Sequence, residues 1–269
     1  MSNGYQIIVC AGIVPDPLQT LEPVQTPTGP GLKNEMMLPA VLDTWASHSL
    51  YEAAHLASKV AGSKVWLVSL APKTKLQQVM MTIAQKAQFE LVAVDCPSGG
   101  FSDPYESAVV LADTIKSIPG LDFNRLFIFG GWESASRGSG VTLQVVGERL
   151  GIINQFQGVD ELKINSDGSF EVYERVTEGK HQISQFSKLP AILGWATGNL
   201  PEPKNNPQIG MINMRTIMPA IQKAKQVKLE NKNLVFTSVQ LPKQERTTRI
   251  VKDTPVEEIA REIVEWIKQ

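Results

Sequence analysis

Apolar residues recur along the chain in two patterns, short continuous runs and stretches with helical spacing. Each run has the length of a buried strand and is bounded by glycine, proline or polar residues. The runs cover residues 7–11, 65–70, 91–94, 126–129 and 190–195. Between them, apolar side chains three or four positions apart predict amphipathic helices. These helices cover residues 50–60, 76–87, 109–115 and 143–150. Strands that alternate with such helices predict an α/β fold in which a mostly parallel twisted sheet carries helices on both faces.

Two of these helices carry start signals in the sequence. Asp103 is a favourable N-cap, and Pro104 occupies the first helical position that tolerates proline. Thr74 and Gln77 have the spacing of a capping box, in which each side chain bonds the backbone of the other. We therefore expect helices to begin next to Asp103 and Thr74.

The second half of the chain changes pattern. Polar and apolar residues alternate over 161–164 and 170–174, on either side of an Asn-Ser-Asp-Gly turn at 165–168. Residues 181–186 predict a third strand of the same kind. We expect these antiparallel hairpins to be inserted before residues 190–195, which rejoin the main sheet.

Several segments show no clear periodicity of apolar residues. The proline-rich residues 15–39 leave the carboxyl end of the first strand, where open α/β sheets bind ligands, and are either a functional loop or a poorly ordered excursion. Residues 199–207 predict a polar loop, and residues 218–225 a short helix with basic residues near its end. No element is predicted with assurance for residues 228–245.

The last helix carries a narrow apolar stripe. Its start signal lies at residues 254–257, and the stripe consists of Ile259, Ile263, Trp266 and Ile267. The stripe either packs on the protein's own sheet or belongs to an arm that docks on another chain, because the Lys-rich stretch before it is long enough to carry it away. We accordingly divide the chain into an α/β domain, residues 1–225, and a C-terminal extension with a partner-docking arm helix, residues 226–269.

The stretch from 126 to 151 has the order strand, glycine-bearing loop and helix. Small residues let a backbone approach a ligand, and the free N–H groups of a helix start attract an anion. Gly138-x-Gly140-x-x-Leu143 resembles a dinucleotide fingerprint without its third glycine, and it begins too far after the strand for a Rossmann turn. An ordinary strand–helix connection and a phosphate loop are both open. Glu133 and Arg137 could form a surface or phosphate-side ion pair.

Composition narrows the classes of function. The net charge is −1, and no basic stripe interleaved with aromatic residues is present, which argues against nucleic acid as a partner. No apolar run reaches membrane-spanning length and no signal-peptide pattern begins the chain, so we expect a cytoplasmic protein that is not an integral membrane protein. Cys10 and Cys96 are expected to be buried thiols. His48 and His55 lack partners at metal-ligand spacing, so no metal site is predicted.

Several short motifs occur in an order and spacing typical of one family. They are Val14-Pro15-Asp16-Pro17, Asp43-Thr44-Trp45, Tyr51-Glu52-Ala53, Val68-Ser69-Leu70-Ala71-Pro72, Lys188-Leu189-Pro190-Ala191-Ile192-Leu193, Asn199-Leu200-Pro201-Glu202-Pro203 and Pro219-Ala220-Ile221-Gln222-Lys223-Ala224-Lys225. With them, the chain resembles the β subunit of electron transfer flavoproteins over nearly its whole length.

This resemblance implies an electron-carrier subunit. Family members pair with a larger α subunit that carries the redox FAD, serve dehydrogenases or other oxidoreductases, and hold AMP in the β subunit, or a second FAD in electron-bifurcating members. Carried over by position, the nucleotide pocket would use Cys10, Asp43, Thr44, Trp45, Ala46, Leu70, Gly130, Gly131, Arg137, Gly138, Ser139, Gly140 and Thr142. Met218 falls where the family has a leucine in its partner-recognition loop, here residues 199–219, and an exposed methionine would suit several partners.

The chain departs from the family in the nucleotide loop. Residues 133–140 read Glu-Ser-Ala-Ser-Arg-Gly-Ser-Gly, whereas the family loop is acidic and carries glutamine. Arg137 would favour a phosphate or pyrophosphate through charge-assisted hydrogen bonds. AMP, FAD and an empty pocket are therefore all compatible with the sequence. The alternative functions are a stand-alone adenine-nucleotide-binding protein and a structural scaffold subunit whose pocket stays empty.

Overall fold

The computed structural model describes residues 4–27, 29–97, 99–230, 234–241, 243 and 248–268. The chain forms two compact units, Met1–Val239 and Gln240–Gln269. The predicted boundary after residue 225 falls within β13 (Lys225–Gln226), which pairs with the main sheet of the first unit.

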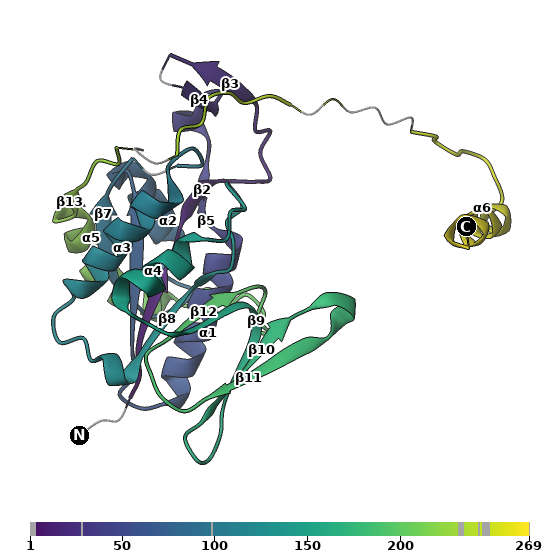
Figure 1. The fold of residues 1–269 in the computed structure, drawn as a ribbon. Helices are drawn as coiled ribbons and strands as arrows, with labels where there is room; N and C mark the ends of the chain where they lie inside the picture. The colour runs from purple at the N-terminus through teal and green to yellow at the C-terminus, as the bar shows by residue number, and fades with distance from the viewer. Residues whose placement is uncertain are drawn as a thin grey trace. The chain divides into compact units, whose positions relative to one another are not determined.

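The first unit is built on one mostly parallel sheet (Figure 1). Its strand order is β11-β10-β9-β12-β8-β1-β6-β7-β13 among the described residues. The bounds are β1 (Gln6–Cys10), β6 (Lys64–Ala71), β7 (Glu90–Asp95), β8 (Leu126–Gly131), β9 (Asn154–Ile164), β10 (Phe170–Arg175), β11 (His181–Phe186) and β12 (Ala191–Trp195). At the centre of the sheet, Val9 of β1 is paired with Leu67 of β6 on one side and Phe129 of β8 on the other, and all three side chains are fully buried.

Helices cover both faces of this sheet. On one face α1 (Thr44–Lys59), α2 (Lys73–Ile83) and α5 (Pro207–Gln222) pack on the larger apolar cluster. On the other face α3 (Pro104–Lys116) and α4 (Thr142–Leu150) pack on a second cluster. The predicted α/β class, with helices on both faces and antiparallel hairpins inserted late in the chain, is confirmed.

The strand order reverses beside β1. The connections from β1 through α1 to β6 and from β6 through α2 to β7 proceed toward one edge of the sheet, with their helices on one face. The chain then crosses through α3 to β8 on the other side of β1, and α3 and α4 occupy the opposite face. The helices that follow β1 and β8 therefore leave the sheet on different faces, which opens a crevice at the carboxyl ends of these strands.

The proline-rich segment after β1 is ordered into small antiparallel pairs. β2 (Ile13–Pro15) pairs with β5 (Ala40–Leu42), β3 (Pro23–Thr26) with β4 (Gly29–Leu32), and a 3₁₀ turn, η1 (Glu35–Met37), lies between them. The pairing of β2 with β5 returns the chain to its departure point, where the Asp43 N–H donates to the Gly12 carbonyl over 2.9 Å. As a result α1 begins at the tip of β1 although a long excursion separates them.

The antiparallel extension of strands β9, β10 and β11 has its own aromatic and ionic contacts. The ring of Phe186 stacks on the rings of both Phe156 and Phe170, with centroids 5.0 and 4.8 Å apart. The buried Asp160 carboxylate accepts two hydrogen bonds from Arg175, over 2.7 and 3.0 Å, and lies 3.0 Å from His181 Nε2. The remaining short 3₁₀ turns are η2 (Phe123–Arg125) and η3 (Thr177–Gly179).

Two predicted helix caps are wrong and one is correct. Asp103 accepts from the Tyr105 N–H over 2.8 Å and Pro104 opens α3, as expected. The expected capping box at Thr74 does not form, because the N-cap of α2 is Pro72, two residues earlier, and no side chain caps the helix. Thr254 does not cap the last helix either, since α6 (Val256–Ile267) begins after Pro255.

The region predicted as a polar recognition loop contains a helix. The loop ends at Asn206, whose side chain caps α5, and α5 continues from Pro207 to Gln222 with Pro219 inside its last turn. The predicted helix at residues 218–225 is therefore the end of a longer one. Met218 lies half-buried on α5 and is not an exposed loop residue.

The second unit contains the helix α6. Its apolar side chains include Val256, Trp266 and Ile267, each 76% exposed, and the helix buries none of its residues among the described residues of this unit. In the part of the chain that the structure describes, no helix combines the length and apolar character needed to span a bilayer.

The buried Asn213 fastens α5 to the sheet. Its amide group donates to the Ala84 and Ala87 carbonyls, both over 2.7 Å, and accepts from the Phe89 N–H over 3.3 Å. These partners lie between α2 and β7, so one side chain joins three elements of the core.

Replacing Asn213 with alanine should reduce the free energy of unfolding by about 2–4 kcal/mol, because buried backbone groups lose their partners. Urea unfolding of the variant and of the exposed control Asn205→Ala measures the difference. An Asn213→Ala loss no larger than that of the control would show that the amide is not a structural anchor.

Candidate functional site

A cavity lies where the strand order reverses. Its walls follow three neighbouring strands: Cys10 to Gly12 after β1, Leu70 at the end of β6, and Gly130 with Gly131 at the end of β8. The starts of α1 and α4 and one side of α3 complete it. The empty space, counted out into the open solvent at its mouth, is about 790 Å³.

Two successive glycines form the floor of the cavity, and a side chain at either position would be crowded. A Cβ on Gly130 would lie 3.3 Å from the Cys10 carbonyl oxygen and 3.2 Å from a Leu143 methyl group. A Cβ on Gly131 would lie only 2.7 Å from the Cβ of Trp45. The end of β8 therefore brings its bare backbone against β1 and α1, which leaves the space above it free for a ligand.

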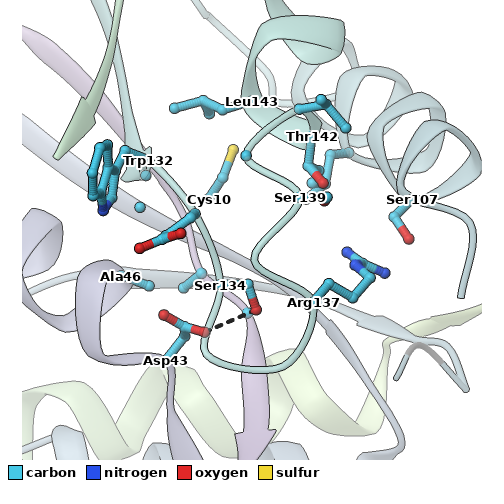
Figure 2. Close-up of a pocket in the computed structure, with 18 of the residues that line it drawn as sticks. Cys10, Asp43, Ala46, Ser107, Trp132, Ser134, Arg137, Ser139, Thr142 and Leu143 are labelled. Carbon is cyan, nitrogen blue, oxygen red and sulfur yellow. Dashed lines mark hydrogen bonds between the residues drawn. The ribbon is translucent and has the colours of Figure 1, made fainter. Parts of the chain in front are cut away.

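Asp43 connects the start of α1 to the loop after β8. Its carboxylate caps α1 through the Trp45 N–H, over 3.2 Å, and accepts from the Ser134 hydroxyl and the Ala135 N–H over 3.0 and 2.8 Å (Figure 2). Burial raises the pKa of the Asp43 carboxyl, although these hydrogen bonds act in the opposite direction. The carboxylate thus positions the loop of residues 132–141 and is not a free ligand for a cofactor.

Arg137 fastens the same loop on its other side. Its Nη1 donates to the Ser102 and Gly99 carbonyls over 2.8 and 3.3 Å, so the guanidinium makes these bonds and not the expected ion pair with Glu133. Its buried Nε has no hydrogen-bond partner among the described residues. Burial lowers the pKa of Arg137, and the negative charge of Asp103 partly offsets the effect. The side chain remains a cation at the edge of the cavity.

The start of α4 faces the cavity with free backbone donors. Gly138 and Gly140 both have positive φ, 61° and 63°, and turn the chain into the helix. Val141 is the N-cap residue, and its side chain makes no hydrogen bond to the helix. The first N–H groups of α4 therefore have no capping side chain as a partner. The helix dipole and these N–H groups together stabilise a bound anion by about 0.3–1 kcal/mol. The hydroxyls of Ser139 and Thr142 line the same side.

Most of the residues predicted from the sequence lie together at this cavity. Those that line it are Cys10, Asp43, Ala46, Leu70, Gly130, Gly131, Arg137, Ser139, Gly140 and Thr142. Thr44, Trp45 and Gly138 do not line it: the first two begin α1 behind the floor, and Gly138 forms the turn before α4.

Several further residues line the cavity. Trp132, Glu133, Ser134 and Val141 fall between the predicted Gly130 and Thr142, in the loop and helix start that the resemblance implies for the pocket, although they were not named singly. Sequence reasoning missed Ala11, Gly12, Ser107, Leu111 and Leu143. Ser107 and Leu111 come from α3, whose nearness to this site depends on the sheet order. In Figure 2 Trp132 stands on one side of the cavity and Arg137 on the other.

Cys10 is the only thiol among the residues that line the cavity. Burial raises its pKa to about 12, so it is a neutral thiol at physiological pH. A neutral buried thiol is a poor nucleophile. The geometry therefore suits binding better than covalent chemistry.

Comparison with known proteins adds no identification. No known family model matches the sequence, and no curated protein is similar enough to the chain to mark a relative.

Replacing Asp43 with alanine removes the cap of α1 and leaves the Ala135 N–H without its acceptor. We expect the free energy of unfolding to fall by about 1–3 kcal/mol, measured by urea denaturation. Asp113→Ala, an exposed aspartate on α3, is the matched control and should cost less than about 0.5 kcal/mol. Equal losses in both variants would refute the anchoring role.

The raised pKa of Asp43 also gives a pH dependence with a definite sign. The folded state binds the proton more readily than the unfolded chain, so the contribution of this group to stability increases as the pH falls through the raised pKa. The stability difference between wild type and Asp43→Asn should therefore shift in favour of wild type between about pH 7 and about pH 4. Thermal unfolding across this range measures it, and a shift in favour of the variant would contradict the assignment.

Proposed function

We propose that this chain is the electron-carrier subunit of a heterodimeric electron transfer flavoprotein. In this role it binds an adenosine phosphate, AMP or the corresponding part of a second FAD, and helps a larger α subunit hold the FAD that passes electrons from dehydrogenases to a downstream acceptor. The observation that best supports nucleotide binding is the cavity at the reversal of strand order. Open α/β sheets bind nucleotides at this position.

The cavity has a side suited to a phosphate. The start of α4 offers N–H groups, Ser139 and Thr142 offer hydroxyls, and Arg137 offers a positive charge. Charge-assisted hydrogen bonds from such donors are the strongest available to an anion in a partly buried site. We therefore assign the phosphate to this side.

The opposite side suits an aromatic base. The ring of Trp132 rests on the backbone of Gly158, where a Cβ would lie 3.4 Å from its Cε3 atom. Ala46 and Leu70 add apolar surface. Stacking on an indole ring stabilises a bound base by about 1–3 kcal/mol and does not depend on a particular set of hydrogen bonds.

Electron transfer requires a positioned cofactor and a suitable electrostatic environment, not a nucleophile or a general base. The site agrees with this requirement, because Cys10 is neutral and the Asp43 carboxylate is engaged in holding the loop. When bound, the FAD of the α subunit supplies the redox chemistry. The residues of this chain would hold the adenosine phosphate and order the loop beside it. The motif resemblance supplies the electron-transfer part of the proposal.

Acid precipitation of the protein co-expressed with an α subunit should release nearly equimolar adenosine phosphate together with FAD, identified by mass spectrometry. Gly12→Leu should remove the adenosine phosphate, because Gly12 lines the cavity and has room for a Cβ, with only Asp43 Cβ near, at 3.9 Å. Gly12→Ala is the matched control and should retain most of the nucleotide. A complex without adenosine phosphate, or equal nucleotide content in both variants, would refute the proposal.

The exposed apolar face of α6 suits the contact with the α subunit. Ending the chain after residue 253 should leave the melting temperature of the first unit unchanged and weaken heterodimer formation on size-exclusion chromatography. Trp266→Glu, on the apolar face, should act in the same way, and Glu265→Gln, on the opposite face by helical periodicity, should have no effect. Unchanged assembly in the truncated chain would show that α6 is not a docking arm.

A further inference from the structure

A second cavity lies along the carboxyl edge of the sheet. It is lined by residues at the ends of β6 and β7, by the β2–β5 excursion and by residues 99–102. Its empty space, counted out to its open mouth, is about 1150 Å³. Prolines, Met36 and Phe101 make much of its surface apolar.

The second cavity adjoins the nucleotide cavity at consecutive chain positions. Gly12 lines the nucleotide cavity and Ile13 the second cavity. In the same way Leu70 faces the first and Ala71 the second. The two spaces therefore lie side by side above β1 and β6.

Arg137 and the segment it holds stand between the two spaces. Arg137 lines the nucleotide cavity, whereas Gly99 and Ser102, whose carbonyls accept its two hydrogen bonds, line the second cavity. The two segments also touch next to these hydrogen bonds, because a Cβ on Gly100 would lie 3.5 Å from the Cβ of Ser136. These residues, 99–102 and 136–137, form a partition across the crevice.

The partition is fastened on the nucleotide side as well. The Ser134 hydroxyl, which donates to Asp43, lies 2.9 Å from the Ser136 hydroxyl, so the loop that carries Arg137 is held next to α1. The Arg137 side chain is half-buried, and its Nη1 is already used by two carbonyls. Opening the partition requires both hydrogen bonds to break.

We propose that Arg137 and the two carbonyls it holds close the nucleotide cavity behind its first phosphate, so that the chain accepts a nucleoside monophosphate and disfavours a dinucleotide. This inference rests on the proposed function and selects among its ligands. Beyond its first phosphate, a dinucleotide carries a second phosphate, a sugar and a ring. The space that could take them is the second cavity, on the far side of the partition.

The second cavity has few groups that would hold a separate anion. Lys75 points its Nζ to the Leu38 carbonyl, and the Lys73 N–H at the start of α2 donates to Asp95 over 3.2 Å. Its apolar surface is instead suited to a ring. The second cavity would therefore become a binding site for the distal half of a dinucleotide once the partition is removed.

Isothermal titration calorimetry tests the inference on the full-length chain after its nucleotide has been removed. The probes are AMP and ADP-ribose, which share the adenosine and first phosphate and differ only beyond it. Wild type should bind AMP at least about tenfold more tightly than ADP-ribose. Arg137→Ala should bind ADP-ribose at least about tenfold more tightly than wild type does, although it has lost a cation.

Two further variants distinguish the effect of removing the partition from the effects of losing a positive charge or of failing to fold. Arg149→Ala removes an exposed arginine from the end of α4 and should leave both affinities unchanged. Arg137→Met, which keeps the length of the aliphatic stem but not the hydrogen bonds, should behave as Arg137→Ala does and serves in its place if the alanine variant does not fold.

The outcomes distinguish this inference from the proposed function. Equal affinity of wild type for both probes, or a fall in ADP-ribose affinity in both Arg137 variants, would overturn the partition while nucleotide binding stands. Wild type that binds neither probe would overturn the proposed function and the partition with it.

Discussion

The reversal of strand order beside β1 determines where this molecule has room for a ligand. A helix that follows a parallel strand packs on the face dictated by the right-handed crossover. Because β1 and β8 are neighbours whose next helices, α1 and α4, pack on opposite faces, a gap opens between their carboxyl ends that neither of these helices covers. The proposals about nucleotide binding depend on this gap.

The walls of the gap are held by two polar side chains and two glycines. Asp43 fastens the loop after β8 to the start of α1, and Arg137 fastens it to residues 99–102 near α3. Gly130 and Gly131 keep the floor free of side chains. The charged residues that sequence reasoning assigned to ligand contact, Asp43 and Arg137, therefore hold the loop in place. The groups left for a ligand are backbone donors, hydroxyls, the positive charge of Arg137 and the indole of Trp132.

The parts of the fold that follow a simple period could be predicted from the sequence. The runs around Val9, Leu67 and Phe129 became the central strands, because a continuous apolar run of that length has no stable place except a sheet covered on both faces. The hairpin around residues 165–168 followed from alternation and turn chemistry. The positions at strand ends could therefore be expected to meet, and most of those named from the sequence do.

Other features depend on long-range contacts or on ambiguous signals. The strands of residues 13–42 are too short and too rich in proline and glycine to show a period, and their pairing returns Asp43 to β1. For α5, only a short helix at residues 218–225 was predicted, whereas the true start signal is Asn206 followed by Pro207. Nothing near Arg137 in the sequence indicates that its partners are Gly99 and Ser102.

The central claim is that an adenosine phosphate is held above Gly130 and Gly131, with its phosphate toward α4 and its base toward Trp132. A crystal structure of the full-length chain grown with AMP tests this most directly. We predict electron density for the phosphate at the start of α4, next to Ser139 and Thr142. Density for AMP at any other place on the chain, or none at saturating AMP, would contradict it.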